Sequence, residues 1–472
     1  MVVDIGLDRA DIEALRRRLS SGASDLAHRA LNRSVRLAVT GLNKSGKTVF
    51  ITSLIHHLSH GSQLPFFKVA SEGRLVGAKI IPRAESELPE FRYREFAEKL
   101  TGRPPSWPEP TDRISEIRLA IRYRPGTMLR RRVTPLSTLY LDIIDYPGEW
   151  LLDLTLLDKS FEDWSQQVLE LCKQEPRASL SKAWFDFLNS LDLTKTAEEE
   201  TMQQAAVLYS EFLHRCKAGG LTLLQPGRFT MPGDLKNTPI LGFCPLPPVA
   251  APPERSFYSV MSQRYEAYKD RVVKRFYQEH FARFDRQIVL VDLLNILNRG
   301  YECFHDMRET LALTLESFSY GRSGLIRRLF RPRIDRVLFA AAKADHVAAN
   351  QHHNLRLLLD QLISEAAEEV RFSGVEMDTM TLSSVKSTET VVTDHEGGKL
   401  SCVKGVPEGR EREVLLFPGE IPETIPTPED WVEDRFRFLS FQPPPVSEAP
   451  SRTLPHIRLD QALEFLLGDK LI

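Results

Sequence analysis

Residues 34–58 read SVRLAVT-GLNKSGKT-VFITSLIHHL, and this stretch decides the fold. The apolar run 34–40 predicts a short strand, and 49–58 carries apolar residues at helical spacing. Between them, 41–48 fits the pattern G-x-x-x-x-G-K-[ST], and the order strand, loop, helix is the context that this pattern requires. Glycines let such a loop wrap a phosphate with its backbone N–H groups, and the start of the helix adds partial positive charge.

The residues of this phosphate loop have distinct expected roles. Lys47 is expected to reach the β- and γ-phosphates as a catalytic residue, and the Thr48 hydroxyl is expected to ligate Mg²⁺. Lys44 could add positive charge at the phosphates, or it could be an ordinary lysine that faces solvent. The alternative for the whole stretch is a glycine-rich turn with an exposed lysine. The remaining residues expected to contact the nucleotide here are Asn43, Ser45, Gly46 and Val49.

A second motif ends a strand further along the chain. The run 139–145, LYLDIID, predicts a strand that ends at Asp145, and Gly148 follows three residues later. A carboxylate at the tip of a central strand can hold the water shell of Mg²⁺, and a glycine N–H can meet a γ-phosphate. We therefore expect Asp145 in the magnesium site and Gly148 at the nucleotide. The alternative is an aspartate that caps the next helix.

A third motif follows another apolar run, 336–342, which predicts a buried strand. Lys343-x-Asp345 places a carboxylate where it can accept both N1–H and N2–H of guanine, a pair of donors that adenine lacks. Leaving a buried carboxylate unpaired is costly, so this contact can select guanine strongly. The stem of Lys343 can cover the base. The alternative for Lys343 and Asp345 is a solvated charge pair at the start of a helix. A weaker signal is Ser384-Val385, where a backbone N–H could meet guanine O6. The alternative there is an isolated tripeptide without this role.

These motifs come in the order and strand context of the Ras-like GTPase fold, over residues 34–148 and 287–390. More narrowly, GLNKSGKT, STLYLDIIDYPGEWLLDL and AAKADH, with a long insertion between the last two, resemble the YcjX-like family of bacterial stress-induced P-loop GTPases. The resemblance implies binding of GTP and GDP, slow Mg²⁺-dependent hydrolysis of GTP, a cytoplasmic protein and a link to stress response. It implies a protein effector without identifying one.

Two positions depart from the Ras-like pattern. Ala342 stands where Asn or Thr usually precedes Lys-x-Asp, so a side-chain contact with the phosphate loop is missing. Glu149 stands where Ras-like enzymes place a water-orienting glutamine. Glu149 could orient water or act as a weak base, although its charge would oppose an approaching γ-phosphate. The alternative is an acid that stabilises a helix start. We therefore expect low intrinsic turnover.

A threonine that closes on Mg²⁺ should precede the first of two antiparallel strands, predicted at 117–123 and 138–144. Thr111, in WPEPTDR, is the best-placed candidate, and we expect it to act in catalysis and as a magnesium ligand. Thr134 lies between the two strands and is less suitable. Binding of GTP and Mg²⁺ would order the segments near Thr111 and 145–150, and hydrolysis would release them.

Alternating strands and helices predict an α/β fold, a Ras-like P-loop domain with a mixed, mostly parallel sheet and an all-α insertion. The run 287–294 predicts a strand of the buried parallel kind, 375–382 predicts a last central strand, and 66–69, 74–81, 413–417 and 436–441 predict shorter ones. We divide the chain into an N-terminal helical segment 1–33, a domain in two parts 34–148 and 287–394, a helical insertion 149–286, and a C-terminal extension 395–472 that packs on the domain.

Composition excludes several classes of protein. The 472 residues suffice for about three domains. The 62 basic and 64 acidic residues give a net charge of −2, which argues against a general nucleic-acid binder. The sequence lacks an apolar run long enough to span a membrane, although peripheral association stays open. Five scattered cysteines and an N-terminus without an apolar core favour the cytoplasm.

Two other functions compete with a GTPase switch. A P-loop ATPase or kinase would prefer ATP and need an acceptor pocket, and Lys343-x-Asp345 argues against it. A nucleotide-stabilised scaffold without catalysis is compatible with Glu149 in place of glutamine.

Overall fold

The structure is a computed structural model. It describes residues 34–42, 44–60, 64–82, 88–109, 111, 113–126, 135–236, 238–319, 334–395, 398–432, 435–445 and 454–472. The predicted N-terminal helical segment 1–33, Asn43 of the phosphate loop and Thr134 lie outside the described residues.

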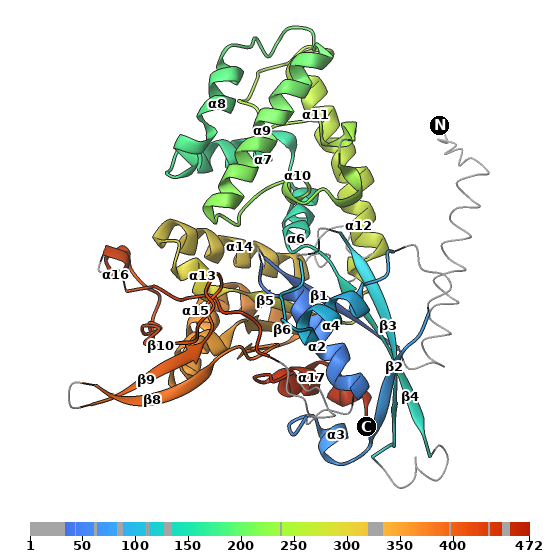
Figure 1. Cartoon of the computed structure of the whole chain (residues 1–472). Helices are drawn as coiled ribbons and strands as arrows, with labels where there is room; N and C mark the ends of the chain where they lie inside the picture. The colour runs from blue at the N-terminus through green and yellow to red at the C-terminus, as the bar shows by residue number, and fades with distance from the viewer. Residues whose placement is uncertain are drawn as a thin grey trace.

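A seven-stranded sheet forms the centre of the molecule, in the order β2-β3-β4-β1-β5-β6-β7 (Figure 1). β3 pairs antiparallel with β2 and with β4, and the other neighbours pair parallel. The predicted α/β class with a mixed, mostly parallel sheet is therefore confirmed. The strands are β1 (Ser34–Gly41), β2 (Leu75–Ile80), β3 (Ser115–Tyr123), β4 (Ser137–Asp145), β5 (Arg286–Val291), β6 (Arg336–Ala341) and β7 (Glu376–Thr381).

Helices cover both faces of the sheet, which explains why β1 and β5 are apolar runs rather than alternating patterns. Leu37 and Val39 of β1 pack in one core with three helices, and Ala38 faces a second, larger core. The first face carries α2 (Lys47–His60), α4 (Tyr93–Thr101) and α17 (Leu459–Leu467). The second face carries α13 (Leu293–Leu297), α14 (Tyr301–Ser319) and α15 (His352–Phe372).

An all-α insertion lies between β4 and β5 and stands above the sheet (Figure 1). Trp164 and Trp184 are among its buried side chains, with rings of Tyr209 and Phe243 around them. The larger core is continuous from these helices to the sheet. The helices are α6 (Glu149–Leu154), α7 (Phe161–Leu171), α8 (Arg177–Asn189), α9 (Glu199–Gly219), α10 (Gly227–Thr230), α11 (Phe257–Tyr268) and α12 (Lys274–Glu279).

Three local predictions were wrong. The run 66–69 leads into α3 (Lys68–Ser71), because the backbone N–H groups of Phe66 and Lys68 donate to carboxylates of α17 instead of to a strand. The run 436–441 forms one isolated bridge and otherwise directs Phe rings into the larger core. The last strand, β7, lies at the edge of the sheet rather than in its centre.

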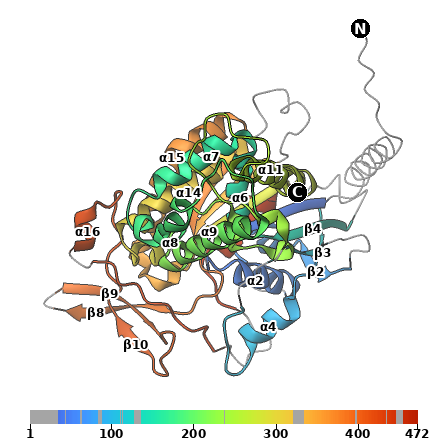
Figure 2. The same ribbon diagram turned by 90° about the horizontal axis from the view of Figure 1, so that it is seen from above.

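A second sheet was not predicted apart from the run that became β10 (Val414–Leu416). Its order is β10-β9-β8, with β8 (Glu389–His395) and β9 (Gly398–Gly405) forming a hairpin. Figures 1 and 2 show this sheet and α16 (Pro428–Val432) projecting on the side opposite to β2. Throughout the part of the chain that the structure describes, every helix is too short or too polar to cross a bilayer.

Candidate functional site

The predicted functional loops follow β1, β4, β6 and β7 at the same edge of the sheet, because these strands run parallel with β5 between them and their carboxyl ends point the same way. Two non-glycine residues with positive φ lie in these loops, Lys44 and Lys343, each at 58°. Such backbone conformations are uncommon outside glycine and cluster at ligand sites.

The phosphate loop turns tightly between β1 and α2. Gly46 has φ of 89°, a conformation that glycine adopts without a steric penalty. Lys47 begins α2, and its Nζ donates a hydrogen bond of 3.0 Å across the loop to the carbonyl oxygen of Gly41. The Lys47 ammonium is thereby held over the loop that a phosphate would enter.

Hydroxyl groups of the loop are buried beside it. Ser45 is 1% exposed, and its Oγ has no hydrogen-bond partner among the described residues. Thr48 is also buried. A buried hydroxyl without a partner is costly, so Ser45 points to a ligand that supplies one. Lys44 is exposed, in keeping with the alternative that it faces solvent.

Asp145 lies beside this loop, because it ends β4 and aligns with Val39 of β1. Its Oδ2 accepts a hydrogen bond of 2.6 Å from the Thr111 hydroxyl, and within the described residues its Oδ1 has no partner. Burial raises the pKa of Asp145, and the positive charge of Lys47 and the Thr111 hydrogen bond act in the opposite direction. The structure thus brings together three predicted residues.

These groups fit a magnesium ion. Mg²⁺ prefers oxygen ligands, and hydroxyl and carboxylate oxygens from Thr48, Thr111 and Asp145 are the kind of donors it uses beside phosphates. The unpartnered Oδ1 of Asp145 is the observation that favours an ion or its water shell at this place.

Gly148 and Glu149 begin α6 directly against the phosphate loop. A Cβ added at Gly148 would lie 2.9 Å from the carbonyl oxygen of Gly41, so a larger residue would displace the loop. Glu149 is buried, and its Oε1 accepts a hydrogen bond of 2.7 Å from Lys217 Nζ. Burial raises the pKa of Glu149, but Lys217 and Lys47 together outweigh it and hold that pKa below its usual range. Glu149 is therefore a buried carboxylate paired with a lysine of the insertion.

The third motif lies where β6 ends. Asp345 is buried, and its Oδ2 accepts hydrogen bonds from the backbone N–H and the hydroxyl of Ser387, at 2.7 and 2.6 Å. Lys343 Nζ lies 2.6 Å from Oδ2 of Asp292, which follows β5 and caps α13. Sequence reasoning missed Asp292 and Ser387. Ser387 lies two residues after Val385, in the loop that the sequence predicted to be near the base. The sequence did not indicate that this serine contacts Asp345.

The loop after β7 is tied to its surroundings. The carbonyl oxygen of Ser384 accepts a hydrogen bond of 2.6 Å from Ser53 of α2. Val385 is buried in a small cluster against which Val49 packs. The backbone N–H of Lys386 donates to Pro455 at 2.7 Å. These contacts connect the helix of the phosphate loop with the loop expected to read the base.

Comparison with known proteins gives the family of the chain. The sequence pattern of the YcjX-like family, DUF463, matches residues 35–471. The chain belongs to the YcjX-like family. A relative from Escherichia coli (strain K12), named "Ras-like GTPase YcjX", is 42% identical over 466 residues, covering 96% of this chain and all of the relative. A relative of the same name from Shewanella oneidensis is 40% identical over 480 residues, covering 96% and 98%.

Family membership applies to the insertion as well as to the sheet, since the match runs through both. In this YcjX-like chain, Lys217 is the site residue that lies furthest in sequence from any motif. It belongs to α9 of the insertion, and no short pattern around it signals a role. Its contact with Glu149 depends on how the inserted helices fold back onto α6.

Proposed function

We propose that this chain binds GTP and GDP, hydrolyses GTP slowly with Mg²⁺, and acts as a nucleotide-dependent switch. The observation that carries the proposal is Asp145, a buried carboxylate beside Lys47 with one oxygen held by Thr111 and the other without a partner among the described residues. The two relatives named "Ras-like GTPase YcjX" support a guanine nucleotide.

Different residues of the chain would bind the phosphates, the base and the magnesium ion. Backbone N–H groups of the phosphate loop and Gly148 would hold the phosphates, and Lys47 would exchange the Gly41 carbonyl for a phosphate oxygen. Ser387 orients Asp345, the residue expected to select guanine. Mg²⁺, held by Thr48, Asp145 and Thr111, would neutralise negative charge on the phosphate oxygens.

Slow hydrolysis follows from the partner of Glu149. A carboxylate that accepts a hydrogen bond from Lys217 and has a lowered pKa is a weak base for an attacking water. The same observation favours the second candidate, a nucleotide-stabilised scaffold without turnover. A P-loop ATPase or kinase is the third candidate function. The buried Asp345, oriented by Ser387, favours guanine over adenine and so argues against it.

The cellular part of the proposal comes from the family resemblance. We propose a cytoplasmic protein with a role in the bacterial stress response and a protein effector still to be identified. The segments near Thr111 and 145–150 would be ordered by GTP and released after hydrolysis.

Calorimetric titration of the full chain with GTP, GDP and ATP in magnesium buffer tests the proposal. GTP and GDP are expected to bind and ATP to bind far more weakly, and phosphate release should show slow turnover. Lys47→Ala is expected to abolish GTP binding, with exposed Lys182→Ala on α8 as the control. If the intact chain binds neither purine triphosphate, or Lys47→Ala keeps its affinity, the proposal is wrong. Binding without phosphate release would favour the scaffold.

A further inference from the structure

Lys217 lies in the last turn of α9 and reaches the start of α6. Its Nζ lies 2.7 Å from Glu149 Oε1, and the two side chains are 20% and 6% exposed. Glu149 also interacts electrostatically with Lys47 of the phosphate loop. The inserted helices therefore place a positive charge next to a carboxylate that adjoins the phosphate loop.

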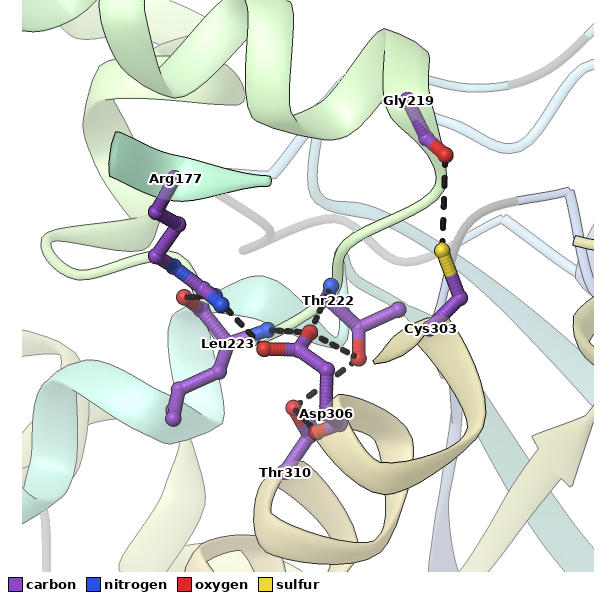
Figure 3. Close-up of polar contacts among 7 residues, drawn as sticks. All are labelled: Arg177, Gly219, Thr222, Leu223, Cys303, Asp306 and Thr310. Carbon is purple, nitrogen blue, oxygen red and sulfur yellow. Dashed lines mark hydrogen bonds and ion pairs between the residues drawn. The ribbon is translucent and has the colours of Figure 1, made fainter. Parts of the chain in front are cut away.

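The turn after α9 is anchored to the sheet side of the molecule by Asp306 of α14 (Figure 3). Asp306 accepts hydrogen bonds from the backbone N–H groups of Thr222 and Leu223 and pairs with Arg177 at 2.6 Å. Thr310 binds the Thr222 hydroxyl at 2.9 Å. Because this buried carboxylate fixes the chain five residues beyond Lys217, the end of α9 is held in place above α6.

The charges at the phosphate loop explain what this placement achieves. Two negative groups close together in a buried site repel each other, and Glu149 would oppose the third phosphate of GTP. Lys47 is the cation expected to bind the phosphates, so it cannot also compensate Glu149. Lys217 supplies the missing positive charge from outside the loop. A GDP molecule lacks the third phosphate and is affected much less.

We propose that Lys217 is a positioning residue that neutralises Glu149 and so makes a site with this carboxylate compatible with a nucleoside triphosphate. The proposal rests on the proposed function and extends it to the insertion. Affinity for GTP, but not for GDP, then depends on the inserted helices holding Lys217 against Glu149.

The test compares the affinities of the full chain for a non-hydrolysable GTP analogue and for GDP. Lys217→Met keeps most of the side-chain volume and leaves Glu149 without its partner. We expect this variant to lose about tenfold affinity for the analogue relative to GDP. The double variant Lys217→Met/Glu149→Gln should restore the wild-type ratio, since the repelling charge is gone. Lys182→Met, an exposed substitution on α8, is the control.

Equal losses for both nucleotides, or a double variant that stays impaired, would show that Lys217 does not act through Glu149. If Lys217→Met does not fold, Glu149→Gln alone decides. This variant leaves the positive charge of Lys217 without a partner, so its affinity for the GTP analogue should rise relative to its affinity for GDP. An unchanged ratio of the two affinities, or a shift in favour of GDP, would overturn the proposal. Wild-type protein that binds neither nucleotide would instead contradict the proposed function.

Discussion

Three of the carboxyl groups that are buried at one edge of the sheet have different kinds of partner. Asp145 is held by a threonine hydroxyl, Glu149 by a lysine ammonium and Asp345 by a serine. Hydroxyl donors orient a carboxylate and leave its negative charge available, whereas an ammonium group neutralises it. Under the proposed function, the same side-chain chemistry would therefore bind a magnesium ion at Asp145, balance a lysine charge at Glu149 and read the guanine base at Asp345.

Asp345→Asn tests the base-reading role at the scale of one residue. An amide presents one acceptor and one donor, so it no longer matches the two N–H groups of guanine but does match xanthine. We expect preference to shift from GTP towards xanthosine triphosphate, measured by competition for a fluorescent nucleotide. Asp378→Asn, at the sheet edge and partly exposed, is the control. Unchanged preference for guanine would refute the assignment of Asp345.

The positions of the motif residues could be predicted from sequence because each short motif directly follows a strand that its apolar residues reveal. Lys47 and Asp145 follow strands that are recognisable from apolar runs, and the structure places them side by side. Lys217 could not be predicted, since its contact with Glu149 spans 68 positions and depends on tertiary packing. The roles of all the motif residues, Ser384 and Val385 among them, stay predictions, because the structure shows their contacts with the protein alone.

At the scale of elements, α6 joins the phosphate loop to the insertion. All six of its residues are buried. Asp153 accepts hydrogen bonds of 2.7 Å from both the backbone N–H of Gly227 and the hydroxyl of Tyr268, and Trp150 donates to the carbonyl oxygen of Met231. A displacement of α6 alone would break these hydrogen bonds. We therefore expect the inserted helices to move together with α6.

Limited proteolysis tests this coupling. With a non-hydrolysable GTP analogue bound, α6 should be held at the phosphate loop, and cleavage within 149–160 should be slower than with GDP. Gel analysis and mass spectrometry would locate the cuts. Cleavage in the exposed turn 190–198 after α8 serves as the internal control and should not change. Identical patterns with both nucleotides would argue against coupling through α6.

Elements were predicted well where packing agrees with local preference. β1, β5 and β6 are largely apolar and almost wholly buried, as expected for strands of a parallel sheet that is covered on both faces. The run 66–69 has the same apolar character, but acids of α17 almost 400 positions away satisfy its backbone donors. The hairpin of β8 and β9 was missed because most of its residues are polar or exposed. The structure of 66–69 therefore depends on contacts that no local window contains.

At the scale of the whole molecule, the last residues pack against the central sheet and α2. Ile457 forms a bridge with Ser383 beside β7, and Arg286 of β5 pairs with Asp469 at 2.7 Å. Leu463 and its neighbours on α17 complete the core under α2. The segment 454–472 therefore holds the expected base-reading loop and the helix of the phosphate loop in one structure.

A buried imidazole lies where this segment meets α2 and makes the contact sensitive to acid. His57 of α2 packs edge-on against His456, with ring centroids 4.8 Å apart. The pKa of His57 is lowered from 6.5 to about 3, chiefly by burial and in part by His456, His56 and His60, while the backbone of Leu454 acts in the opposite direction. Because the pKa is lower in the folded than in the unfolded chain, the stabilisation is complete above pH 6.5 and is lost as the pH falls towards 3.

From pH 7 to pH 5, protonation of unfolded His57 should lower the free energy of unfolding by about 2 kcal/mol. Urea unfolding of the full chain at pH 7, 6 and 5 measures this loss. His57→Leu removes the titrating group from an apolar position, so the loss should shrink by that amount, whereas His214→Leu, exposed on α9, should leave it unchanged. If both variants keep the wild-type pH dependence, the acid sensitivity does not come from the contact between α2 and the C-terminal segment.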